Sequence, residues 1–100
     1  MKVLKSILKD SLLYYRRFEK DLQRKLEKLP LGSVKRRKIK NHIYYYLQVR
    51  EGKRVVHRYV GRVEPKELVE RIKRRRFLKS ELKKVRMALR LLPVRKILSW

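Results

Sequence analysis

The spacing of apolar residues changes twice along this chain, and the changes fix the order of its elements. In residues 2–29 and 65–92 apolar side chains recur every three or four residues, which is the period of an amphipathic helix. In residues 33–62 the period falls to two, as in a strand with one buried face. The sequence therefore predicts an α+β fold in the order α-β-β-β-α, within a single basic domain spanning residues 1–100.

Helix-breaking residues mark the ends of the two predicted helices. Pro30 and Gly32 stop the first apolar stripe, since proline and glycine rarely continue a helix. Pro65 stands where the first residue of the second helix belongs, and Pro93 ends that helix. Residues 94–100 follow as a C-terminal tail, which we expect to form a last turn and dock.

The middle segment predicts a three-stranded antiparallel meander. Residues 43–50 are rich in aromatic and β-branched side chains, and a second such run, residues 53–60, follows directly after Gly52. Two strand-like runs around a glycine are typical of a β-hairpin. Residues 34–40 add a strand, with residues 41–42 as the turn, and so small a sheet needs a helix against one face.

The apolar stripes of the two helices, which we call the helix seams, leave two arrangements open. The helices can pair antiparallel within one chain, or the seams can serve a homodimer or another protein partner. The first seam comprises Leu4, Leu8, Tyr15, Phe18, Leu22, Leu26 and Leu29. The second comprises Leu68, Ile72, Leu78, Leu82, Val85, Leu89 and Leu92.

Charge is the strongest indication of function. The chain has 32 Lys and Arg against 9 Asp and Glu, a formal net charge of +23. Such an excess opposes folding by self-repulsion unless a polyanion is bound, and nucleic acid is the polyanion that we expect. The charged surface of a thermophile protein would balance its cations with glutamate in ion-pair networks, which this chain does not do. One Asn, two Gln and no Thr nevertheless indicate a hot-growing source.

Residues for catalysis and metal binding are largely missing. The chain has no Cys, which excludes disulfides, thiolate zinc sites and a Cys nucleophile, and its acids are scattered. His42 and His57 could approach each other across the hairpin and cleave RNA by acid–base catalysis. Since no other catalytic group accompanies them, we favour polar positions on a basic sheet. The sequence predicts no enzymatic activity, no metal and no cofactor.

Apolar runs are too short for a membrane-spanning helix, which needs roughly 20 apolar residues. The N-terminus begins like a signal peptide, but Lys9 and Asp10 interrupt what would be its apolar core. For residues 2–29 the alternative is a basic amphipathic helix on an anionic membrane, and we favour a helix packed on another helix. We expect a cytoplasmic protein without a membrane partner.

The central strand has one apolar face and one face suited to nucleic acid, because side chains alternate across a strand. The apolar face, which we expect to cover the helices, comprises Ile43, Tyr45, Leu47 and Val49. The other face comprises His42, Tyr44, Tyr46, Gln48 and Arg50. Aromatic rings stack on bases, and Gln and Arg bind base edges or phosphates. The alternative for the tyrosines is cross-strand stabilisation of the sheet.

The length of the turn at Gly52 decides which third-strand residues join that second face. A two-residue turn puts there Val55, His57 and Tyr59. A three-residue turn puts there Arg54, Arg58 and Arg62 instead. Because a slip of one residue moves every side chain to the other face, both alternatives stay open.

Two basic runs complete the candidate site. Residues 35–38 precede the hairpin, and residues 73–76 wrap around the second helix. We expect both runs to contact phosphates, which fixes position without reading sequence. The alternatives are a nuclear import signal for the first run and a solvated helix face for the second. The candidate nucleic-acid-binding residues are Lys35, Arg36, Arg37, Lys38, Lys40, Tyr44, Tyr46, Gln48, Arg50, Lys53, Arg54, Arg58, Arg62, Lys73, Arg74, Arg75 and Arg76.

Residues 29–90 resemble a small uncharacterised prokaryotic family found near mobile elements and beside transposase-like or toxin–antitoxin genes. The resemblance rests on Leu29–Val34, Tyr44–Leu47, Arg50, Gly52-Lys53, Val55 and Tyr59–Arg62, followed by a basic helix. It implies nucleic-acid binding without a known activity.

The predicted sheet also resembles the arm-binding domain of phage integrases, which lays three strands in the DNA major groove. This resemblance implies that Tyr44, Tyr46, Gln48, Arg50 and the third-strand arginines read DNA. The long first helix departs from the integrase pattern and suggests a partner or dimerisation in place of a tethered catalytic domain.

Three functions compete at this point. The favoured one is a non-enzymatic DNA-binding module that reads with its sheet and holds phosphates with its basic runs. The second is an RNA-bound subunit of a ribonucleoprotein such as the ribosome. The third is an antitoxin-like interaction module whose helix seams bind an acidic protein.

Overall fold

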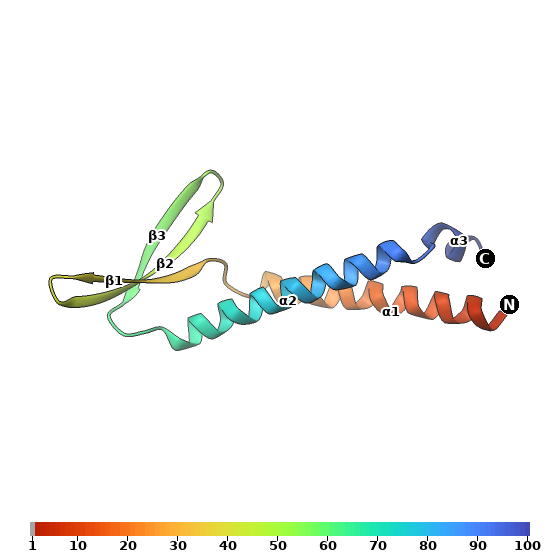
Figure 1. Ribbon diagram of the computed structural model, residues 1–100, viewed down its shortest axis with the longest axis horizontal. Helices are drawn as coiled ribbons and strands as arrows, with labels where there is room; N and C mark the ends of the chain where they lie inside the picture. The colour runs from red at the N-terminus through yellow and green to blue at the C-terminus, as the bar shows by residue number, and fades with distance from the viewer. Residues whose placement is uncertain (1) are drawn as a thin grey trace. The chain divides into compact units, whose positions relative to one another are not determined.

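The computed structural model describes residues 2–100, which form three helices and one three-stranded antiparallel sheet (Figure 1). Within those residues the elements are α1 (Lys2–Glu27), β1 (Ser33–Ile39), β2 (His42–Glu51), β3 (Arg54–Gly61), α2 (Lys66–Leu91) and α3 (Val94–Ser99). The predicted α+β fold in the order α-β-β-β-α is confirmed. A short helix, α3, stands where a docking turn was expected.

The described residues divide into two compact units. The helical unit joins the chain up to Lys28 with Phe77–Trp100, and the sheet unit is Leu29–Arg76. Helix α2 begins in the sheet unit and ends in the helical unit. The organisation as a single folding domain stays a prediction.

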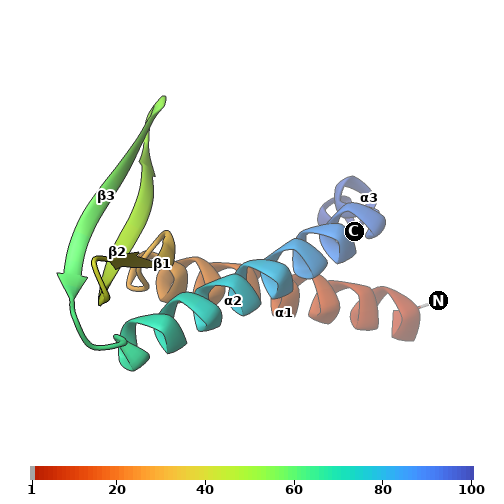
Figure 2. The same ribbon diagram turned by 60° about the vertical axis from the view of Figure 1, so that its left-hand side comes forward.

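In the helical unit, α1 lies beside the second half of α2, as Figures 1 and 2 both show. An ion pair joins them, with Arg86 Nε 3.1 Å from Glu19 Oε2. The buried side chains of this unit are Leu12, Leu22, Leu26, Leu78, Leu82, Val85 and Ile97. The two seams therefore meet within one chain. The placement of Leu4 in the buried seam is wrong, since half of that residue is exposed.

Helix α3 brings the end of the chain onto the first turns of α1. Ile97 is only 1% exposed, the lowest value among the buried apolar residues of the described chain. Lys9 Nζ donates a hydrogen bond of 3.1 Å to the backbone oxygen of Trp100. Lys5 Nζ lies 5.4 Å from the centre of the Trp100 ring, within the range of a cation–π interaction. The predicted docking of the tail is thus provided by Ile97 and Trp100.

In the sheet unit the strand order is β1-β2-β3, and both pairs are antiparallel. The β1–β2 turn is Lys40-Asn41, one residue earlier than predicted. Both turn residues have positive φ, 47° and 66°, which matches the two-residue turn that follows the twist of a hairpin. The second turn position is therefore held by Asn41 and not by His42, the residue predicted there. Asn adopts the left-handed conformation more readily than most other residues.

The apolar face of β2 is turned towards the first half of α2. Tyr45 and Val34 line one cleft together with Val69 and Ile72 of that helix. Ile72 is 4% exposed, and the apolar side chains of β2 are half-buried. This arrangement supplies the helix that a small sheet needs on one face. The predicted direction of the Tyr45 face is confirmed.

We expect Ile97→Ala to lower the free energy of unfolding by about 2–4 kcal/mol, since truncating a buried Ile leaves a cavity. The neighbouring Leu98 is 64% exposed, so Leu98→Ala is the matched control. This substitution should change the free energy of unfolding by less than about 0.5 kcal/mol. Urea unfolding followed by circular dichroism measures both. Equally small effects would show that α3 is not docked on α1.

A second prediction concerns Gly32, which precedes β1. Its φ is +115°, and a Cβ there would lie 2.5 Å from the backbone oxygen of Gln48. Gly32→Ala should therefore lower the free energy of unfolding by about 3 kcal/mol or more. At Gly52 the φ is +62° and a Cβ would meet no atom within 4 Å, so Gly52→Ala should cost about 1 kcal/mol. Equal losses in urea unfolding would contradict this reading of the close approach.

Candidate nucleic-acid interface

The face of the sheet opposite Tyr45 is the candidate interface, and we call it the open face. The pairing of β1 with β2 sets Lys35 opposite Tyr46 and Arg37 opposite Tyr44. The pairing of β2 with β3 sets Tyr46 opposite Tyr59. Paired residues of an antiparallel ladder point to the same side. The open face therefore comprises Ser33, Lys35, Arg37, Ile39, His42, Tyr44, Tyr46, Gln48, Arg50, Val55, His57 and Tyr59.

The two-residue turn at Gly52-Lys53 settles which side of β3 joins the open face. Glu51 pairs with Arg54, so the turn holds two residues and the first sequence alternative applies. Val55, His57 and Tyr59 lie on the open face, as that alternative requires. Arg54 and Arg58 lie on the other side, which we call the helix-side face, and there Arg58 forms an ion pair with Glu51.

A β-bulge near the end of β3 adds Arg62 to the open face. Tyr46 pairs with Tyr59 and Tyr45 with Gly61, so the register shifts at Val60. An extra residue in one strand reverses the alternation that follows it. Arg62 accordingly reaches the open face, where its guanidinium carbon lies 5.7 Å from the centre of the Tyr44 ring. Neither turn alternative predicted that His57, Tyr59 and Arg62 would share one face.

Three tyrosine rings form the centre of the open face. Tyr59 lies between the other two, with its ring centre 6.2 Å from that of Tyr44 and 5.7 Å from that of Tyr46. The rings are tilted by 57° and 60°, a geometry that aromatic pairs favour over face-to-face stacking. Tyr44 and Tyr46 are half-buried and Tyr59 is exposed, so the cluster both stabilises the sheet and is accessible.

Two arginines cover the outer tyrosines in similar ways. The guanidinium carbon of Arg37 lies 5.2 Å from the ring centre of Tyr46, and Arg37 Nη2 lies 3.5 Å from His57 Nδ1. Arg62, over Tyr44, has its Nη2 2.8 Å from His42 Nδ1, within hydrogen-bond distance. The open face thus holds two arginine–tyrosine–histidine clusters with Tyr59 between them.

The two histidines belong to different clusters. His42 pairs with Ile39, whereas His57 pairs with Gln48, six residues further along β2. The approach of the two rings across the hairpin, on which acid–base cleavage of RNA would depend, is therefore not found in the described structure. The absence of enzymatic activity itself stays a prediction.

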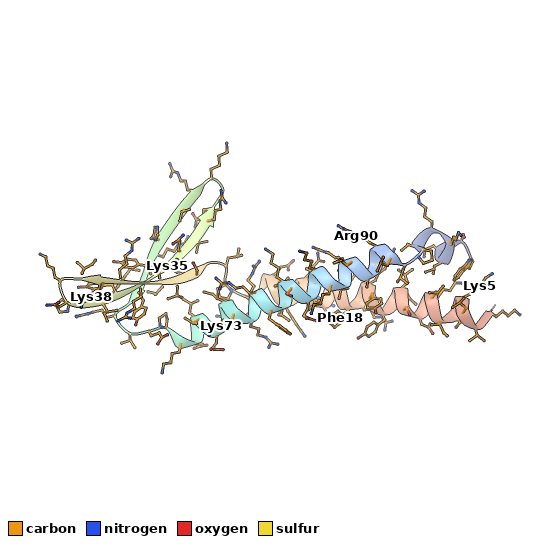
Figure 3. The ribbon with its side chains drawn as sticks, viewed as in Figure 1. Lys5, Phe18, Lys35, Lys38, Lys73 and Arg90 are labelled. Atoms are coloured by element: carbon orange, nitrogen blue, oxygen red, sulfur yellow. The ribbon has the colours of Figure 1, made fainter. Side chains whose placement is uncertain are left out.

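The open face carries positive charge without acidic side chains. Its cations are Lys35, Arg37, Arg50 and Arg62. The residues of the open face named above, all within the described part of the chain, include no Asp or Glu. Such a surface attracts phosphates and repels other cations. Figure 3 shows nitrogen-tipped side chains along the strands, with Lys35 labelled on β1.

The remaining candidate residues do not share the open face. Those on the helix-side face are Arg36, Lys38, Arg54 and Arg58. Those in turns are Lys40 and Lys53, and those on α2 are Lys73, Arg74, Arg75 and Arg76. Lys73 and Arg76 line the cleft between α2 and the sheet. Arg75 has a buried Nε with no hydrogen-bond partner in the described structure.

Three residues of the open face were not among the candidate binding residues, namely His42, His57 and Tyr59. The sequence placed His42 on that face and gave His57 and Tyr59 as one of two alternatives for it. His57 and Tyr59 depend on the β2–β3 register, which the sequence left open. The signal that could have found them is Gly52 followed by Lys53, a pair compatible with a two-residue hairpin turn.

Metal and membrane features are absent from the described residues. Residues 2–100 contain no group of three or more His, Cys, Asp and Glu that could hold a metal ion. Among the helices of the same residues, none combines the length and the apolar character that crossing a membrane requires.

Comparison with known proteins gave one match. A family model described as "Domain of unknown function (DUF6788)" matches residues 12–70, more than half of the chain. The matched segment includes the whole sheet and therefore the open face. No curated protein and no solved structure matches the chain.

Proposed function

Since the chain belongs to the DUF6788 family, whose function is unknown, we propose its function from the sheet: it binds nucleic acid, and DNA first, through the open face. The observation that carries the proposal is one exposed surface on which three tyrosines lie among four cations without a carboxylate. In this proposal the protein is a non-enzymatic binding module that acts in the cytoplasm.

The charge of the open face supports binding to a phosphate backbone. Cations that neutralise phosphates release condensed counterions, which supplies most of the sequence-independent affinity. Lys35 and Arg37 on β1 and Arg50 on β2 are exposed and have no acidic partner in the described structure. They can therefore form ion pairs with phosphates without first breaking one inside the protein.

The aromatic and amide groups support contacts with bases. Tyrosine rings and guanidinium planes both stack on bases, and the clusters of Arg37 with Tyr46 and Arg62 with Tyr44 hold the two groups together. Gln48 and Arg50 follow on the same strand and carry the donors that pair with adenine and guanine edges. The β2–β3 hairpin is a two-stranded ribbon, which the major groove of B-DNA admits.

The test compares Arg37→Ala with Arg54→Ala, which removes the same charge from the helix-side face. Binding to matched duplex DNA, single-stranded DNA and structured RNA is measured by fluorescence anisotropy over a salt series. For the ligand bound at highest salt, Arg37→Ala should weaken affinity about 5- to 100-fold and reduce the salt slope by about one, as expected for loss of a base or phosphate contact. Arg54→Ala should leave both near the wild-type values.

Each outcome of this test has a definite meaning. Equal losses of affinity in both variants would show that binding depends only on overall charge, and would contradict the open face as the binding surface. If binding to structured RNA persists at higher salt than binding to duplex DNA, DNA is not the first ligand, and the result favours a ribonucleoprotein subunit. Circular dichroism of both variants checks that the sheet is intact.

A further inference from the structure

We propose that the sheet unit has a second site, independent of the open face, that binds one nucleotide unit: a phosphate attached to a base-bearing sugar. The site is the cleft between the helix-side face and the first half of α2, with a volume of about 390 Å³. All of its lining residues belong to the sheet unit. The open-face proposal can fail without affecting it.

The cleft has an apolar part and a cationic part. Val34, Val69 and Ile72 supply apolar walls, and Tyr45 adds an aromatic ring. The cations are Arg36 from β1 and two residues one turn apart on α2, Lys73 and Arg76. A flat apolar group with an attached anion matches both parts.

Two of the three cations of the cleft, Arg36 and Arg76, have no acidic partner in the described structure. Lys73 Nζ lies 3.8 Å from Glu70 Oε1, which is a loose contact between exposed side chains. Arg76 Nη2 donates only a long hydrogen bond, 3.5 Å, to the neutral backbone oxygen of Gly32. By contrast Arg58, on the same face outside the cleft lining, is paired with Glu51.

Three cations line the cleft together with one carboxylate, Glu64. In a chain of net charge +23 this concentration of like charge opposes folding unless an anion is bound. Phosphate suits two guanidiniums and an ammonium, because its oxygens accept several charge-assisted hydrogen bonds at once. The geometry therefore points to a phosphate beside Arg36, Lys73 and Arg76.

The size of the cleft limits the ligand to a single nucleotide unit. Ligand pockets span about 300–1,000 Å³, so this cleft is at the small end of that range. A duplex cannot enter it, whereas a base can lie against Tyr45 and the valines while its phosphate meets the cations. The same chemistry is offered by a free nucleotide and by the phosphorylated end of a nucleic-acid strand.

The test uses the full-length protein and isothermal titration with adenosine 5′-monophosphate, adenosine and inorganic phosphate. We expect the monophosphate to bind at least about tenfold more tightly than either part alone, since each part fills only half of the cleft. Arg36→Gln and Arg76→Gln should each weaken binding of the monophosphate about tenfold or more, the effect of removing charged hydrogen bonds. Arg54→Gln removes a charge from the same face outside the cleft and should not weaken it.

Two oligonucleotides of one sequence, with and without a 5′-phosphate, separate the two sources of the ligand. If the 5′-phosphate raises the affinity of the oligonucleotide and Arg36→Gln abolishes that gain, the site binds strand ends. If the 5′-phosphate has no effect while the monophosphate still binds, the site binds free nucleotides. The proposal is overturned if neither the monophosphate nor the 5′-phosphate binds detectably, or if Arg36→Gln and Arg54→Gln have equal effects. Circular dichroism on heating verifies that the variants are folded.

Discussion

The register of β3 against β2 determines which β3 side chains reach each face of the sheet, and the proposed open-face site depends on it. The two-residue turn after Glu51 sets the alternation, and the bulge at Val60 reverses it before the strand ends. Together they bring His57, Tyr59 and Arg62 to the open face and leave Arg54 and Arg58 on the helix-side face. A slip of one residue would exchange these sets and remove both arginine–tyrosine–histidine clusters.

The acids of the described chain lie away from the open face, whereas Glu64 and Glu70 lie at or beside the cleft. The ion pairs in the described residues join Asp21 to Arg24, Glu51 to Arg58, Glu70 to Lys73, Glu81 to Lys84 and Glu19 to Arg86. None of these pairs in residues 2–100 involves the open face, and most are exposed pairs that contribute little stability. Both proposed sites therefore hold cations that an anionic ligand can neutralise.

Alternation and helical period were enough to predict the order of elements and the faces of the central strand. Tyr44, Tyr46 and Gln48 follow from side-chain alternation in a single strand, which needs no partner to be read. Residues of β3 could not be assigned in this way, because their faces depend on a turn and on a bulge at Val60 that no local pattern marks. Leu12 was likewise missed, since packing against other helices, not period alone, decides which part of a wide apolar stripe is buried.

The most direct test of the open face is the proton NMR spectrum of the tyrosine rings during titration with a short DNA duplex. The chain has six tyrosines, of which Tyr44, Tyr46 and Tyr59 form the open-face cluster while Tyr14 and Tyr15 lie on α1. The account predicts that the ring signals of the three cluster tyrosines shift as DNA binds, while those of Tyr14 and Tyr15 stay in place. Shifts of the α1 rings with no change in the cluster would contradict it.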